Sequence, residues 1–194
     1  MNQIANQNLF FVKEHVGMFK AANNFDIFNP ETQQKIMECR EEKLGFFTKM
    51  FRFTNYKRMT PFNITVRTTD GEKVLTVKRG TTLFLSKVDV YDEKDQLIGG
   101  FKQKISFTGS MKVVGSEKQE LCTLEGKWST WEFTFVKDYT EFARVTKKWA
   151  GIGKELFTTA DNYVLKISEK VPENNPMRLL ILAAVLCVDM VLKE

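Results

Sequence analysis

The spacing of apolar residues changes once along the chain, close to residue 175. Between Leu9 and Ile167, apolar and polar residues mostly alternate, and turn residues close each short run. From Leu179 to Val188 no residue is polar. Because alternation is typical of strands and a long apolar run of a buried helix, the pattern predicts β-structure followed by one helix.

The alternating part predicts hairpins. One pair of strands meets at Asp70-Gly71, a strong hairpin signal. A first strand begins near Leu9, and the other predicted strands are 25–29, 34–39, 62–67, 73–78, 87–91, 96–102, 110–114, 120–124, 131–135, 142–146 and 163–167. The sequence therefore predicts ten to twelve short strands, at about 9–168.

The predicted helix covers about 176–193. Asn175 is a suitable N-cap, and Pro176 fits the first helical position. The helix is apolar on all sides, so it must be buried in protein or in lipid. Its uninterrupted run reaches roughly 15 Å, whereas a bilayer core needs about 30 Å, and Asp189 interrupts it. We therefore favour a helix in the protein core over the alternative, a membrane tail anchor.

A barrel closed around this helix would bury the apolar face of every strand together with the helix. We therefore predict a mainly β fold, a closed barrel around a central C-terminal helix, as one domain over residues 1–194. The alternative is a two-sheet sandwich with a packed helix.

Composition adds the protein class. Hydrophobic residues make up 43% and charged residues 27%, which is typical of a globular domain. The three cysteines show no metal-binding or disulfide spacing, and residues 1–8 do not resemble a signal peptide, so we expect a cytoplasmic protein. With His15 as its single histidine, the chain has no evident catalytic site, and we expect no enzyme activity.

The segment from Phe142 to Tyr163, with the closing apolar helix, resembles the phospholipid scramblase family. That family has a Lys-x-Trp-x-Gly core, an acidic and aromatic segment ending in Asp-Asn-aromatic, and an Asp-bearing helix. The matching residues are Lys147 or Lys148, Trp149, Gly151, Glu155, Thr158, Ala160, Asp161, Asn162, Tyr163 and Asp189.

The chain is also similar to the LURP-one-related proteins. The resemblance implies the tubby-like fold, a barrel of about twelve strands around a central C-terminal helix. Animal scramblases typically carry a Pro-rich N-terminal extension and a cysteine cluster suited to palmitoylation, and this sequence has neither.

The family's calcium-like loop corresponds to residues 159–170. Its ends carry Thr159 and Lys170 in place of acidic residues, which leaves Asp161 and Glu169. Calcium takes six to eight oxygen ligands, usually with several carboxylates. We therefore expect no calcium site and no other cofactor.

A basic and aromatic stretch over residues 43–58 is the first candidate binding site. It contains no carboxylate, and aromatic residues alternate with its cations Lys43, Lys49, Arg52, Lys57 and Arg58. Cations beside aromatics suit an anionic membrane surface. The alternative is a strand with its aromatics in the core and its bases in water.

A second stretch without carboxylates, over residues 142–154, brings Arg144, Lys147, Lys148 and Lys154 around Trp149. The resemblance to tubby-like domains implies that such cations on the barrel surface bind phosphoinositides. We expect a scramblase-related, non-catalytic module acting peripherally at anionic phospholipid or phosphoinositide headgroups. The alternatives are a true scramblase that moves lipids between leaflets and a nucleic-acid or protein-binding module on the same barrel.

Overall fold

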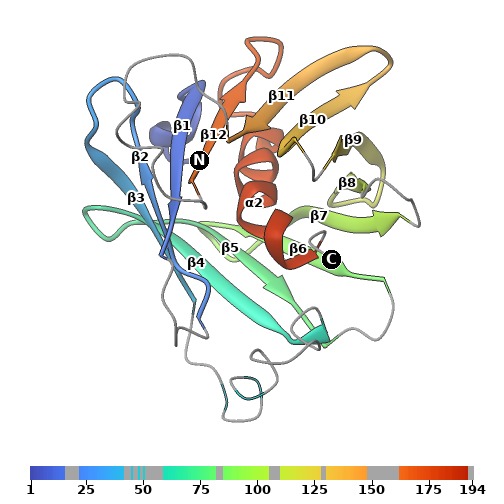
Figure 1. The fold of residues 1–194 in the computed structure, drawn as a ribbon, viewed down its shortest axis with the longest axis horizontal. Helices are drawn as coiled ribbons and strands as arrows, with labels where there is room; N and C mark the ends of the chain where they lie inside the picture. Colours follow the sequence, from blue (N-terminus) through green and yellow to red (C-terminus); the bar gives the residue numbers. More distant parts are fainter. Residues whose placement is uncertain are drawn as a thin grey trace.

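The fold is a closed antiparallel barrel of twelve strands with one helix inside it (Figure 1). The computed structural model describes residues 1–15, 22–41, 45, 48, 50, 59–81, 85–104, 110–127, 130–147 and 162–191, with the backbone alone at 127 and 189–191. The predicted fold class is confirmed.

Each strand pairs with its neighbours in sequence, and β1 closes the ring against β12. The elements are η1 (Gln3–Asn6), β1 (Leu9–Glu14), β2 (Phe25–Phe28), β3 (Lys35–Glu41), β4 (Phe62–Thr68), β5 (Lys73–Arg79), β6 (Lys87–Asp92), β7 (Leu97–Lys104), β8 (Ser110–Gly115), β9 (Glu120–Lys127), β10 (Glu132–Lys137), β11 (Thr140–Thr146), β12 (Asn162–Ile167) and α2 (Pro176–Val191).

Alternation places one face of each strand in the core. In β4, for example, Phe62, Ile64 and Val66 are buried, while Arg67 is exposed. Slipping such a strand by one residue would turn its apolar set outwards, so burial fixes the register. The predicted turn at Asp70-Gly71 joins β4 to β5, and Gly71 has a φ of 88°, which glycine adopts without steric cost.

Helix α2 lies inside the ring and is buried from Arg178 to Val188. Its start agrees with the predicted cap, because the side chain of Asn175 accepts a hydrogen bond from the backbone N–H of Met177 at 2.9 Å. Among the described residues, no helix is long and apolar enough to cross a membrane. The strands and α2 share one hydrophobic core.

Gly99 lets the sheet lie close to the helix. A Cβ at this position would meet the carbonyl oxygen of Val114 at 2.2 Å and Cδ1 of Leu180 at 3.2 Å. Its φ of 147° is also one that other residues rarely adopt. The absence of a side chain at Gly99 therefore allows α2 to pack against β7.

Arg178 closes the end of the barrel where α2 begins. Its side chain is 2% exposed. The guanidinium donates to the backbone carbonyls of Ala5, Asn6, Gln7 and Val171 and to Oδ1 of Asn8, at 2.6 to 2.9 Å. These bonds tie the chain around η1 to α2, and burial lowers the pKa of Arg178.

Candidate functional site

The structure describes only part of the predicted site. All five cations of the first basic stretch lie outside the described residues: Lys43, Lys49, Arg52, Lys57 and Arg58. The same is true of Lys148, Lys154 and Asp161. Arg144, Lys147 and Glu169 are described.

Arg144 is held by an ion pair on the outer face of β11. Its Nε donates to Oε1 of Glu141 at 3.0 Å, and its Nη2 to Oε2 at 2.7 Å. The hydrogen bond from Arg144 holds the pKa of Glu141 below its usual range. Both side chains are about half exposed, so the pair contributes little stability. An anionic ligand of Arg144 would have to compete with Glu141.

Lys147 is held by aromatic rings. Its Nζ lies 3.4 Å from the ring centroid of Trp131 and 5.1 Å from that of Tyr163. Trp131 has a φ of 52°, which is uncommon for a residue with a side chain. The contact is a cation–π interaction between the turn before β10, the end of β11 and β12.

A groove of about 750 Å³ runs along β11, β12 and the turn after β12. Arg144 and Lys166 are direct cross-strand partners there. The groove is lined by Asn8, Glu141, Ala143, Arg144, Lys166, Ile167, Ser168, Glu169 and Lys170. Glu169 therefore lies among three cations. In the described part of the chain no three His, Cys, Asp or Glu side chains are placed to hold a metal ion.

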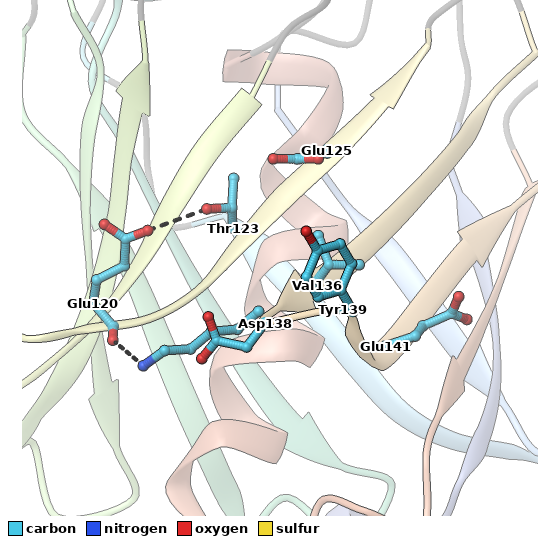
Figure 2. Close-up of a pocket in the computed structure, with 8 residues that line it drawn as sticks. Glu120, Thr123, Glu125, Val136, Asp138, Tyr139 and Glu141 are labelled. Atoms are coloured by element: carbon cyan, nitrogen blue, oxygen red, sulfur yellow. Dashed lines mark hydrogen bonds between the residues drawn. The ribbon is translucent and has the colours of Figure 1, made fainter.

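A second groove, of about 570 Å³, is acidic (Figure 2). Its carboxylates are Glu120, Glu125, Asp138 and Glu141, on β9, on β11 and in the turn after β10. Within it, Nζ of Lys137 donates to the carbonyl oxygen of Glu120 at 3.2 Å. The groove gives this sector of the barrel a negative outer face.

The turn beside the acidic groove has an unusual backbone. Asp138 and Tyr139 have φ values of 49° and 62°, as a type I′ hairpin turn requires. This turn usually contains Asn or Gly, so the sequence does not predict its geometry. The Tyr139 side chain is fully exposed as a result.

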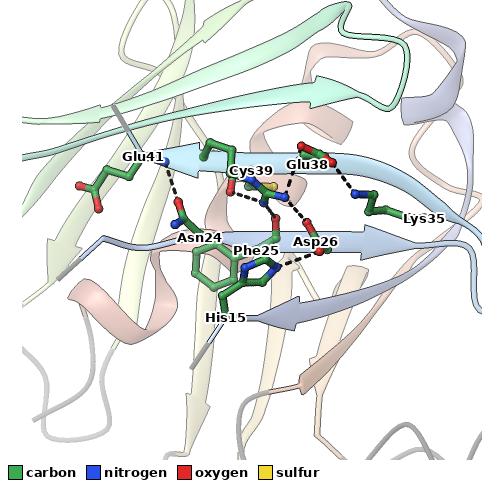
Figure 3. Close-up of polar contacts among 9 residues, drawn as sticks. His15, Asn24, Phe25, Asp26, Lys35, Glu38, Cys39 and Glu41 are labelled. Carbon is green, nitrogen blue, oxygen red and sulfur yellow. Dashed lines mark hydrogen bonds and ion pairs between the residues drawn. The ribbon is translucent and has the colours of Figure 1, made fainter. Parts of the chain in front are cut away.

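His15 belongs to a charged network on β1 to β3 (Figure 3). Its Nε2 lies 2.8 Å from Oδ2 of Asp26, whose Oδ1 accepts from Nη2 of Arg40 at 2.6 Å. Arg40 also contacts Glu38 at 3.3 Å, and Glu38 pairs with Lys35. The network joins β2 and β3 to the residue that follows β1.

All three cysteines are free and buried. Burial raises the pKa of the Cys122 and Cys187 thiols to about 12, and it also raises that of Cys39. Since the thiolate is the nucleophile, these side chains are unsuited to covalent catalysis.

The register creates a basic feature that the sequence analysis missed. Lys87 on β6 faces Lys102 on β7, and Lys102 faces Lys112 on β8. We call these three residues the lysine row. The predicted strands contained all three, but strand pairing had to be known before they could be placed side by side.

Comparison with known protein families identifies a family that the chain matches. A family model described as Scramblase matches residues 3–194. Searches of curated proteins and of solved structures gave no match. The matched range includes η1, all twelve strands and α2.

Proposed function

Because the chain belongs to the scramblase family, we propose that it is a non-catalytic module that binds anionic phospholipid membrane surfaces, including phosphoinositide headgroups. On this proposal it is a peripheral protein of the cytoplasm and uses no calcium or other cofactor.

The observation that carries the proposal is the position of the apolar and charged residues. The buried side chains of the strands and α2 fill the described barrel with one core. Both grooves described above are on the outer face and are lined mainly by charged or polar residues. The described grooves therefore lie on the outer surface of a chain with a net charge of +5. An anionic surface is the partner that such a charge attracts.

The reactive side chains support a binding role over a catalytic one. His15 is engaged with Asp26, and the thiol of Cys39 is fully buried with a raised pKa. A Cys–His pair needs its thiol within hydrogen-bond reach of the imidazole and open to a substrate. Such a pair is not formed among the described residues.

Co-sedimentation and lipid translocation together test this function. The chain is mixed with vesicles of phosphatidylcholine alone or with equimolar phosphatidylserine. We expect binding only to the second kind. In a parallel assay, labelled lipids in the inner leaflet should stay protected from an external quencher. Equal binding to both kinds of vesicle would contradict the proposal, and rapid loss of protection would support lipid movement between leaflets instead.

A further inference from the structure

The lysine row is an unusual arrangement for a β-sheet. Side chains directly opposite one another on neighbouring strands lie about 5 Å apart, and like charges at that distance destabilise the sheet. Here Lys102 has a lysine on each side, Lys87 on β6 and Lys112 on β8. The three ammonium groups therefore repel one another in the folded protein, and a bound anion would reduce that repulsion.

The carboxylates near the row neutralise only its ends. Lys87 pairs with Asp89 at 3.0 Å, and Lys112 pairs with Glu120 at 2.5 Å. Lys102 in the middle and Lys104, two residues further on the same face, form no salt bridge within the described ranges. This outer face of β6 to β8 therefore carries four lysines, of which two form salt bridges with carboxylates. The excess positive charge lies around Lys102, at the middle of the lysine row.

An exposed apolar residue lies next to these cations. The backbone N–H of Gln103 donates to the carbonyl oxygen of Ser86 at 3.0 Å, so the pairing of β6 with β7 continues past Lys87. Continued by one more residue, this register assigns Leu85 the position opposite Lys104, and Leu85 is 49% exposed. A leucine beside lysines suits a lipid interface, where cations meet headgroups and the apolar side chain enters the boundary of the acyl chains.

The acidic groove borders the outer face of β6 to β8, which carries the lysine row. Its carboxylates begin with Glu120 on β9, the strand next to β8. A membrane that approached over β9 to β11 would meet Glu125, Asp138 and Glu141 and be repelled. The charges therefore favour an approach over β6 to β8.

From this arrangement we infer that the outer face of β6, β7 and β8 is the surface that docks on an anionic lipid membrane, with Lys102 at its centre. This inference rests on the proposed function and adds the binding face and the orientation of the barrel. The face differs from both basic stretches that the sequence analysis selected.

Lys102→Glu tests the inference with a matched control. The control is Lys13→Glu, because Lys13 is exposed on β1, six places from β7 in the strand order, and the charge change is the same. Binding to equimolar phosphatidylserine and phosphatidylcholine vesicles should fall at least about tenfold for Lys102→Glu, because loss of the lysine removes roughly a factor of five and the anionic surface also repels the new carboxylate. For Lys13→Glu it should fall by no more than about threefold, as expected of a cation far from the surface.

Thermal unfolding separates lost docking from lost structure. In Lys102→Glu the new carboxylate lies between Lys87 and Lys112, so repulsion becomes attraction. The melting temperature should therefore stay the same or rise while lipid binding falls. A lower melting temperature together with weaker binding would overturn the inference.

Two further measurements distinguish this inference from the proposed function. If Lys57→Glu/Arg58→Glu abolishes vesicle binding and Lys102→Glu does not, the face is wrong and the function stands. If the parent chain binds none of the phosphatidylserine vesicles, or binds single-stranded DNA more tightly at matched salt, both proposals fail. If Lys102→Glu loses vesicle binding and Lys57→Glu/Arg58→Glu keeps it, the result supports both the proposed function and the docking face.

Discussion

The Nε of Arg178 donates a hydrogen bond of 2.9 Å to the backbone carbonyl of Ala5, 173 positions earlier in the chain. The bond is buried and joins the start of the core helix to η1. The same guanidinium donates to the backbone carbonyls of Asn6, Gln7 and Val171, so it supplies the hydrogen bonds that water would otherwise make. The bond therefore ties α2 to η1, a segment far from it in the sequence.

Arg178→Ala should destabilise the protein by at least about 3 kcal/mol, because several buried carbonyls would lose their donor together. Chemical denaturation followed by fluorescence measures the free energy of unfolding. The control is Arg144→Ala, which breaks an exposed pair with Glu141 and should change that free energy by less than about 1 kcal/mol. Equal effects of the two substitutions would show that Arg178 does not hold the barrel end.

Gly99→Ala should destabilise the fold by about 2 kcal/mol or more, because the new Cβ meets the carbonyl oxygen of Val114 in a strained backbone conformation. Gly80→Ala is the matched control, since a Cβ at Gly80 meets nothing within 4 Å. Differential scanning calorimetry compares the two variants. A melting temperature for Gly99→Ala as high as that for Gly80→Ala would contradict the close approach of Gly99 to the carbonyl oxygen of Val114.

Asp26 should contribute to loss of stability in acid. Burial raises the pKa of Asp26, but hydrogen bonds from Arg40 and His15 outweigh this, and its pKa lies below the ordinary value of 3.8. The carboxylate therefore stabilises the fold above that value, and its contribution is lost as the pH falls through the lowered pKa. Asp26→Asn should be less stable at neutral pH and less sensitive to acid.

Unfolding curves measured between neutral pH and the acid range test this sign. Asp70→Asn, in the exposed turn between β4 and β5, should keep the acid sensitivity of the parent. An unchanged acid limb in Asp26→Asn would show that the network of Figure 3 does not act on this carboxylate.

The thiols should be unreactive in the folded protein. Cys39, Cys122 and Cys187 are each at most 1% exposed, and burial raises the pKa of each thiol. A thiol-specific reagent at mildly alkaline pH should therefore label none of them within minutes, and label all three in denaturant. Rapid labelling of Cys187 in the native protein would contradict the burial of α2, and rapid labelling of Cys39 or Cys122 would contradict the burial of its strand face.

Much of this fold follows from local pattern. The alternation of apolar and polar residues predicted the strands, Asp70-Gly71 predicted a hairpin turn, and Asn175-Pro176 predicted the start of the helix. These signals depend on residues close together in the sequence. The role of Arg178 could not be predicted, because its acceptors are backbone atoms of distant residues, and backbone atoms have no sequence signature.

The candidate site was less predictable for the same reason. Local charge selected Arg144 and Lys147, but the structure pairs the first with Glu141 and places the second on Trp131. The lysine row lies on three strands, and each strand contributes one cation to it. A local count of charges along the chain cannot detect such a row, whereas strand register does.

The salt dependence of vesicle binding shows whether electrostatic attraction holds this protein on anionic lipid. The screening length falls from about 10 Å at 0.1 M salt to about 3 Å at 1 M, so attraction between lysines and anionic headgroups should weaken steeply across that range. We predict tight binding of the parent chain to phosphatidylserine vesicles at low salt and loss of that binding at high salt, with weak binding to phosphatidylcholine throughout. Binding that is independent of salt, or equal for the two lipids, would contradict it.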